Sequence, residues 1–208
     1  MVVFGLQLMN IFTAYYSLGI YLLQLLDLLS GKKHIAMIKI IFTGPECSGK
    51  TTLSTSVSKE TNTNLVKEYA REYLSKINRP YEFSDLLQIA KGQRKLTQQA
   101  SVYKQKFLVC DTDLEVIKIW SLVKYGKCDS WILNNQDKEA YYFLCHPEVP
   151  WKDDPFRENR NNRLDLFELY NQELFENKRK FKILKGNQKE RFNTAYTTIT
   201  QIVSQNLL

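Results

Sequence analysis

The sequence predicts an α/β fold in which helices cover both faces of a parallel sheet. Short apolar segments of strand length alternate along the chain with longer segments of helical length. The connections between the strand-like segments contain no Asn-Gly turn of the kind that closes a hairpin. No internal repeat or low-complexity stretch interrupts this alternation. Such a pattern builds βαβ units, whose strands run parallel within one sheet.

The first strand is expected at residues 38–43 (IKIIFT), an apolar and β-branched run that is too short for a helix and ends at a Gly-Pro pair. A helix over 48–60 and a short strand at 65–68 follow. The next helix covers 69–77 and stops before an Asn-Arg-Pro sequence, because proline does not continue a helix.

The longest predicted helix lies in the middle of the chain. Ser84 is placed to cap a helix from residue 85 to about residue 103, with apolar side chains along one side. Another buried strand is expected at 106–110 (KFLVC) and leads into an Asp-Thr-Asp sequence. The helix after it covers 114–125 and ends at Gly126, since glycine suits the left-handed position that follows a helix.

The last part of the chain repeats the alternation. A strand at 141–145 (YYFLC), a helix at 164–178, a strand at 181–184 and a helix at 189–205 are expected. The irregular segment 147–163 is rich in charge, Asn and Pro. We interpret this segment as a small lid over a site, with an ordinary surface connection as the alternative.

The composition excludes several classes of protein. The 208 residues are 44% apolar and 25% charged, which is typical of a globular domain and not of collagen-like, low-complexity or wholly disordered chains. The net charge of +7 favours anionic partners, but the basic residues are spread along the chain, so we expect no nucleic-acid partner. The cysteines form no CxxC pair, which indicates reduced thiols in the cytoplasm and no disulfide framework.

The first 36 residues differ from the rest. Residues 11–29 are mostly apolar and carry no charge apart from Asp27, and a run of this length approaches that of a transmembrane helix. The segment lacks the basic start and cleavage pattern of a signal peptide. Three interpretations stay open: residues 1–36 are a misassigned start before Met37, residues 1–30 are a membrane anchor, or they form a soluble helix packed on the body. We expect residues 37–208 to form the domain.

The segment Gly44–Thr51 (GPECSGKT) fits the phosphate-binding motif G-x-x-x-x-G-K-[ST], directly after a predicted strand and before a predicted helix. Backbone N–H groups of this loop and the helix N-terminus would surround the β-phosphate of a nucleotide. Lys50 would reach the β- and γ-phosphates, and the hydroxyl of Thr51 would bind Mg²⁺. The sequence therefore predicts a nucleoside triphosphate site, with contacts from Gly44, Pro45, Glu46, Cys47, Ser48, Gly49, Lys50, Thr51 and Thr52.

Three carboxylates are candidates at the carboxyl edge of the predicted sheet. Asp111 follows a buried strand and is expected to bind the magnesium ion. Asp113 would face the acceptor, or would instead cap the helix that starts at residue 114. Glu68 ends the second predicted strand and would accept a proton from an attacking hydroxyl. Arg71, one helical turn on, would contact substrate or pair with a neighbouring carboxylate.

Three arginines recur at three-residue intervals in the predicted lid: Arg157, Arg160 and Arg163. This spacing suits side chains along one side of a lid, where they would neutralise charge on a transferred phosphoryl group. The alternative is a solvated basic loop.

The order of GPECSGKTTL, EYAREYL, CDTD, PWKDDPFREN and KGNQKERF resembles the ribosylnicotinamide kinase domain of bacterial NadR-type proteins, which are P-loop kinases. The resemblance runs from about Met37 to the C-terminus. It implies a P-loop kinase fold with a five-stranded parallel sheet, helices on both faces and a small lid. It also implies that Glu68, Arg71 and Asp113 lie on the nucleoside side, that Asp111 binds the metal, that Arg157 is the lid arginine, and that Asn187 lies near the adenine.

The activity that this resemblance implies is transfer of the γ-phosphoryl group of ATP, with Mg²⁺, to nicotinamide riboside. Lys50 and Arg157 would stabilise the transferred group, while Glu68 or Asp113 would act as the base. The partner would be a nucleoside-type small molecule. Alternatives are a kinase for another nucleoside or for a nucleoside monophosphate, and a regulatory P-loop ATPase. The chain has no N-K-x-D sequence for base recognition of the GTPase kind.

Overall fold

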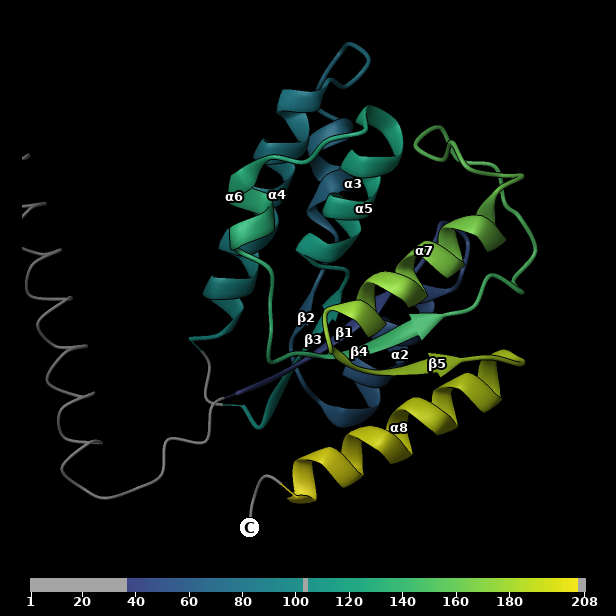
Figure 1. Cartoon of the computed structure of the whole chain (residues 1–208). Coiled ribbons are helices and arrows are strands. Elements are labelled where there is room, and N and C mark those ends of the chain that lie inside the picture. The colour runs from purple at the N-terminus through teal and green to yellow at the C-terminus, as the bar shows by residue number, and fades with distance from the viewer. Residues whose placement is uncertain (1–36, 103–104, 206–208) are drawn as a thin grey trace, which may run out of the picture. The chain divides into compact units, whose positions relative to one another are not determined.

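The computed structural model describes residues 37–102 and 105–205 (Figure 1). The extension and possible anchor expected at residues 1–36 lie outside the described residues. Among the described helices, none has the length and apolar character that a membrane crossing requires. The elements are β1 (Ile38–Thr43), α2 (Lys50–Thr61), β2 (Leu65–Val66), α3 (Tyr69–Leu74), α4 (Phe83–Ala100), β3 (Phe107–Asp111), α5 (Leu114–Tyr125), α6 (Ser130–Asn134), β4 (Tyr141–Cys145), α7 (Arg163–Glu176), β5 (Lys180–Leu184) and α8 (Gln188–Gln205).

The strands form one sheet in the order β2-β3-β1-β4-β5, and every pair in it is parallel. The central strand β1 pairs on both sides, with Ile40 opposite Val109 of β3 and Tyr141 of β4. This arrangement confirms the predicted α/β class with a five-stranded parallel sheet. The carboxyl ends of the strands lie along one edge, where ligands bind in folds of this kind.

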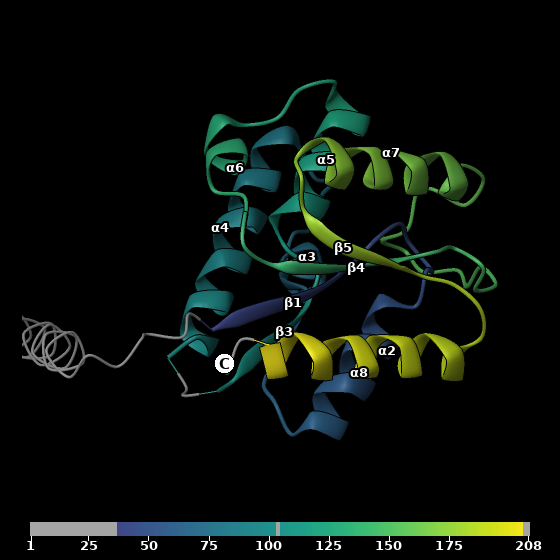
Figure 2. The same cartoon turned by 60° about the horizontal axis from the view of Figure 1, so that its bottom comes forward.

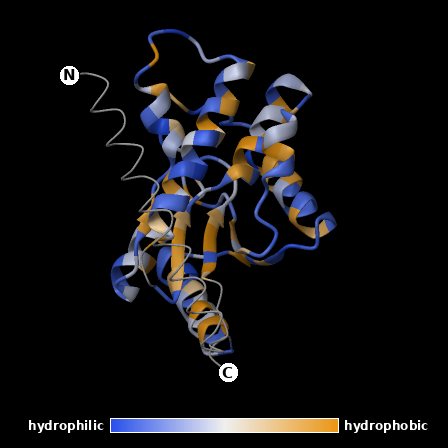
Figure 3. Cartoon of the chain, turned by 90° about the vertical axis from the view of Figure 1, so that its left-hand side faces the viewer, coloured by the Kyte–Doolittle hydropathy of each residue, from blue (hydrophilic) through white to orange (hydrophobic). Residues whose placement is uncertain are grey.

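Alternate residues of the strands fill two separate cores. On one face, Ile40 and Phe42 pack with Leu53 of α2 and Ile199 of α8. On the other face, Ile41 and its neighbours pack against α5 and α7. Figure 2 shows α2 and α8 on one side of the sheet and α4, α5 and α7 on the other, and Figure 3 shows that the strands between them are hydrophobic. Burial on both faces explains why the strands are nearly continuous apolar runs.

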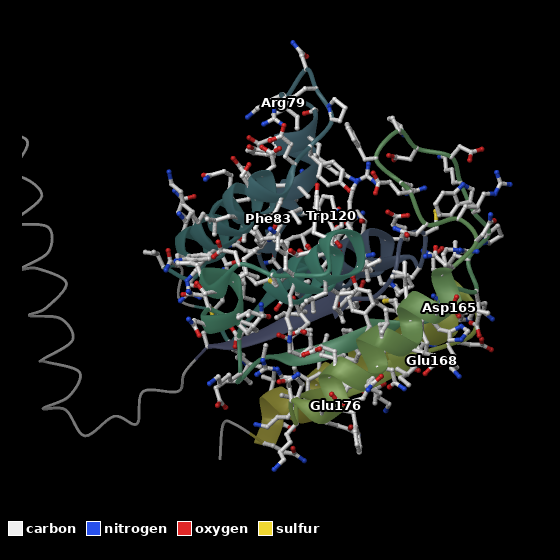
Figure 4. All side chains as sticks on the ribbon, turned by 45° about the horizontal axis from the view of Figure 1, so that its top comes forward. Arg79, Phe83, Trp120, Asp165, Glu168 and Glu176 are labelled. Atoms are coloured by element: carbon white, nitrogen blue, oxygen red, sulfur yellow. The ribbon has the colours of Figure 1, made fainter. Side chains whose placement is uncertain are left out.

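A third core joins α3, α4, α5 and α6 into a helical layer beside the sheet. Leu86 and Ile89 of α4 pack there with Ile117 of α5 and Ile132 of α6. Figure 4 shows Trp120 on α5 below the loop between α3 and α4 that carries Arg79. The indole Nε1 of Trp120 donates a hydrogen bond to the hydroxyl of Tyr81 in that loop, at 2.8 Å. This layer forms the wall of the site opposite the phosphate-binding loop.

Several boundaries differ from the expected ones for local reasons. β2 stops at Val66, so Glu68 precedes α3 instead of ending a strand. α4 is not capped by Ser84: it begins at Phe83, and the Asp85 carboxylate accepts the backbone N–H of Glu82 at 2.7 Å. The short helix α6 was not expected from the sequence; the Asp129 side chain caps it.

Candidate active site

The loop between β1 and α2 has the backbone conformation that a phosphate-binding loop requires. Gly44 and Gly49 have φ angles of 128° and 87°, which disfavour residues with a side chain. A Cβ atom at Gly44 would also lie 2.8 Å from the carbonyl oxygen of Cys145. Cys47 adopts a left-handed φ of 50° between them. The expected strand, loop and helix are therefore all present around this motif.

The polar groups of the loop are arranged toward its interior. The ammonium group of Lys50 donates to the carbonyl oxygens of Gly44 and Pro45, both at 2.8 Å. The hydroxyl groups of Ser48 and Thr43 are buried without a hydrogen-bond partner among the described residues. Unpartnered buried donors are costly, and a bound phosphate would supply acceptors for such groups.

Asp111 and Thr51 fit the magnesium site that the motif predicts. Asp111 is buried at the end of β3, and its Oδ1 atom has no hydrogen-bond partner among the described residues. Burial raises the pKa of Asp111, while the Thr51 hydroxyl bonded to it and the charge of Lys50 lower it. A carboxylate oxygen and a hydroxyl at this edge are hard ligands suited to Mg²⁺. No cluster of three or more His, Cys, Asp or Glu side chains that could hold a metal ion occurs in the described part of the chain.

A cavity of about 520 Å³ extends from the phosphate-binding loop to the helical layer. Its polar end contains Lys50, Thr51 and Glu68, and its far end is mostly apolar. The far end lies between α3, α5 and α7, with Leu74, Val116, Ile119, Trp120, Leu166 and Tyr170 among its lining residues. The volume and the apolar walls suit a small organic molecule placed next to a nucleotide.

Glu68 lies where the polar and apolar parts of this cavity meet. Its side chain is 25% exposed, and burial raises its pKa, opposed mainly by the charge of Lys50. The guanidinium of Arg71 lies 3.7 Å from the Glu68 carboxylate and donates to Asp154 at 2.8 Å. Arg71 is thus ion-paired and also lines the cavity, and its contact with substrate stays a prediction. A carboxylate with a raised pKa beside a phosphate-binding loop is suited to accept a proton.

Asp113 does not reach this cavity. Its Oδ1 atom accepts the backbone N–H of Glu115 at 3.1 Å, and its Oδ2 atom accepts the hydroxyl of Tyr142 at 2.8 Å. The side chain lines a separate cavity of about 200 Å³. Thr112 has a left-handed φ of 73°, which turns the chain between the two aspartates. These contacts confirm the alternative, a helix cap, and place Asp113 outside the cavity that Glu68 lines, which speaks against a role for it as a catalytic and substrate-binding residue.

The arginines of the predicted lid have three different environments. Arg157 lines the cavity and donates to the carbonyl oxygen of Lys152. Arg160 is exposed and lies 3.6 Å from Asp153. Arg163 begins α7 and donates to the carbonyl oxygen of Val149 at 2.8 Å. The three side chains therefore have different partners, and Arg157 is the one of the three that lines the cavity.

Asn187 is occupied by a structural role in this arrangement. Its Oδ1 atom accepts the backbone N–H groups of Lys189 and Glu190, at 3.0 and 3.1 Å, at the start of α8. It does not line the cavity described above. A contact between Asn187 and adenine stays a prediction.

Arg191 is a residue of the site region that the sequence interpretation missed. It is 2% exposed and donates to the carbonyl oxygens of Ser48 at 2.9 Å and Gly186 at 2.7 Å. It also donates to the carboxylate of Glu148 at 2.9 Å, at the start of the lid. This one side chain fixes the phosphate-binding loop, the loop before α8 and the lid relative to one another. The sequence carries no signal for it beyond its place in KGNQKERF, because most basic residues of such helices are exposed.

Comparisons with solved structures support the fold. A NadR protein in complex with NR is 19% identical, covering 81% of this chain and 52% of that one, with a TM-score of 0.65. A NadR protein in complex with NAD and AMP-PNP is also 19% identical, covering 80% and 49%, with a TM-score of 0.61. Thymidylate kinase from Ehrlichia chaffeensis is 16% identical, covering 81% and 99%, with a TM-score of 0.56. The chain thus spans about half the length of the NadR chains it matches.

These similarities confirm the expected resemblance to NadR and the P-loop kinase fold, at the level of chain topology. No curated protein sequence matches the chain significantly. The profile of one family, described as AAA domain, matches residues 39–191 and so includes the phosphate-binding loop, Glu68, Asp111 and the lid. Because this match covers most of the 208 residues, the chain belongs to the AAA domain family.

Proposed function

We propose that this protein is an ATP- and Mg²⁺-dependent kinase that phosphorylates the 5′-hydroxyl of a nucleoside, and that the nucleoside is nicotinamide riboside. The proposal rests on one observation: the phosphate-binding loop and an apolar pocket belong to the same cavity, and Glu68 lies between them. We assign the activity to residues 37–208, with a lid at about 147–163. The fold shared with NadR proteins, one of them solved with NR, supports this acceptor.

In the proposed reaction, Glu68 accepts the proton of the 5′-hydroxyl while that oxygen forms a bond to the γ-phosphorus. The bond from the γ-phosphorus to ADP breaks, and the electron pair leaves with ADP. Lys50 and Arg157 stabilise the negative charge on the transferred group. Thr51 and Asp111 would hold Mg²⁺, which neutralises charge on the phosphates when bound. Positioning and charge do most of the work in such a transfer.

The charges of the acceptor side support a nucleoside over a nucleoside monophosphate. Arg71 is paired with Asp154 and Glu68. Lys124, the other cation on this wall of the cavity, is paired with Glu158 at 2.9 Å. A phosphorylated acceptor would need cations that are free to bind its phosphate. The proposed acceptor therefore brings no phosphate of its own.

The test is a coupled assay of ADP release with nicotinamide riboside, nicotinamide mononucleotide, thymidine, thymidylate and no acceptor. We expect nicotinamide riboside to give the fastest release. Faster release with a mononucleotide would overturn the argument from paired cations, and equal release without any acceptor would indicate an ATPase. Lys50→Ala is the inactive control, and Lys59→Ala, an exposed change on α2, is the matched active control.

A further inference from the structure

We propose that Glu46 is a positioning residue, whose carboxylate holds lid residues 158–159 against the phosphate-binding loop and so keeps Arg157 over the reacting phosphoryl group. This inference rests on the proposed function, because Arg157 matters only if a phosphoryl group is transferred. The phosphate-binding motif itself assigns no role to the side chain at this position, since the loop binds phosphate through its backbone.

The side-chain hydrogen bonds that Glu46 forms with the described residues are all with the lid. Its two carboxylate oxygens accept the backbone N–H of Glu158, at 3.1 and 3.2 Å. One of them accepts the backbone N–H of Asn159 at 2.9 Å, and the other lies 3.5 Å from the Asn159 amide nitrogen. Two successive N–H groups directed at one carboxylate form charge-assisted hydrogen bonds, which are stronger than neutral ones.

A second contact fixes the lid on the other side of Arg157. The Sγ atom of Cys47 lies 3.4 Å from the backbone nitrogen of Lys152 and 3.6 Å from its carbonyl oxygen. That same carbonyl accepts the guanidinium of Arg157. Arg157 is therefore bracketed by two attachments to neighbouring residues of the phosphate-binding loop, at 152 and at 158–159.

Glu158 also binds the helical layer that forms the opposite wall of the cavity. Its carboxylate accepts the ammonium group of Lys124 at 2.9 and 3.1 Å and the hydroxyl of Tyr81 at 2.8 Å. Its backbone N–H is bound to Glu46 on the nucleotide side. One residue thus joins the two walls of the cavity, and Glu46 is the nucleotide-side end of that connection.

The chemical type of the residue supports the same conclusion. A carboxylate in a phosphate-binding loop opposes the binding of anions, because like charges repel. The N–H groups of the lid offset that repulsion, and they do so only when the lid lies on the loop. Glu46 therefore favours the closed position of the lid, which is the position that brings Arg157 to the cavity.

The first test separates positioning from folding. We expect Glu46→Ala to lower kcat for the nucleoside about tenfold, which corresponds to about 1.4 kcal/mol, because the charge-assisted hydrogen bonds to the lid are lost. The affinity for Mg-ADP should stay within about twofold, since the loop backbone is unchanged. Glu46→Gln, whose amide oxygen still accepts an N–H, should restore most of the rate. Glu60→Ala, an exposed change on α2, is the matched control.

The second test asks whether Glu46 acts through Arg157. In an Arg157→Ala background, Glu46→Ala should have little further effect on kcat, because the group it positions is already gone. Additive losses in the double variant would overturn the proposal.

The third test needs no activity and so distinguishes this inference from the proposed function. Trypsin cleaves after Lys152, Arg157 and Arg160, all within the lid. Glu46→Ala should increase the rate of cleavage there, with Glu60→Ala equal to the wild type. Unchanged lid cleavage in Glu46→Ala would refute the inference. Faster cleavage in a protein that phosphorylates no nucleoside would refute the proposed function and leave the contact between loop and lid standing.

Discussion

Replacing Asp113 with asparagine is expected to stabilise the protein at neutral and alkaline pH and to leave phosphoryl transfer intact. The amide oxygen can still accept a hydrogen bond from the Glu115 backbone or the Tyr142 hydroxyl, the two donors that Asp113 now uses. The variant removes the negative charge from a site that is 8% exposed. Because the side chain lies outside the cavity that holds Glu68, the chemistry should not depend on it.

The size of the effect follows from the pKa of Asp113. Burial raises this pKa from 3.8 to about 7, with the charges of Glu115 and Asp137 adding to the rise and the Tyr142 hydrogen bond opposing it. A carboxyl group with a higher pKa in the folded chain binds its proton more tightly there. This tighter proton binding adds up to about 4 kcal/mol to the free energy of unfolding. The contribution is fully present below about pH 4 and is lost as the pH rises through 7.

The assay is urea unfolding of the wild type and Asp113→Asn between pH 4 and 8.5, with ADP release measured in parallel. The free energy of unfolding should decline with pH more steeply in the wild type than in the variant. Asp165→Asn, an exposed change on α7 (Figure 4), should match the wild type within about 0.5 kcal/mol. Loss of transfer in Asp113→Asn together with an unchanged pH profile would refute this reasoning and return Asp113 to the reacting centre.

Three further changes test the site. Lys50→Ala should reduce the rate of phosphoryl transfer by about 10²–10³, since the ammonium group stabilises charge that develops in the reaction. Its thermal unfolding midpoint, measured by calorimetry, should stay close to that of Lys59→Ala. Normal turnover in a folded Lys50→Ala variant would exclude the loop from the chemistry. Glu68→Gln should reduce the rate of ADP release by about 10²–10⁴, because it removes the base alone. Isothermal titration should show unchanged Mg-ADP binding. A parallel loss of Mg-ADP binding would contradict the role of Glu68 as the base. Arg191→Ala should lower the free energy of unfolding, measured in urea, by about 2–4 kcal/mol, since it leaves the buried carbonyl oxygen of Ser48 without its partner. An unchanged midpoint of urea unfolding would show that water replaces the guanidinium group.

The elements that the sequence predicted best are those with strong local signals at both ends. α5 runs from Leu114 to Tyr125 as expected, because Asp113 caps its start and Gly126 takes a φ of 64° at its end. β1 and β4 also have the expected bounds, since they are apolar runs between polar or glycine-rich segments. The helix α6 is five residues long, too short for a periodic pattern to show.

The candidate site was predictable where chemistry depends on the backbone motif and less so where it depends on long-range contacts. The phosphate-binding loop lies where its motif indicated, with Lys50 and Asp111 beside it. Asp113 was expected either to face the acceptor or to cap the helix that follows it, and the sequence left both open. The left-handed φ of Thr112 turns the chain between the two aspartates, and threonine gives no warning of it. Contacts such as that of Arg191 with Ser48, 143 positions away, have no local signature.

The turn at Thr112 separates the roles of the two aspartates on either side of it, Asp111 and Asp113. Two aspartates separated by one residue have different partners, Thr51 for Asp111 and Glu115 and Tyr142 for Asp113. The pKa of Asp111 responds to Thr51, Lys50 and Arg71, whereas that of Asp113 responds to Glu115, Tyr142 and Asp137, and neither aspartate appears among the main influences on the other. One residue of unusual backbone conformation therefore directs the carboxylates of two nearly adjacent residues to different tasks. Asp111 is left beside Thr51 and Lys50 at the phosphate-binding edge, whereas Asp113 is committed to the start of α5 and to Tyr142.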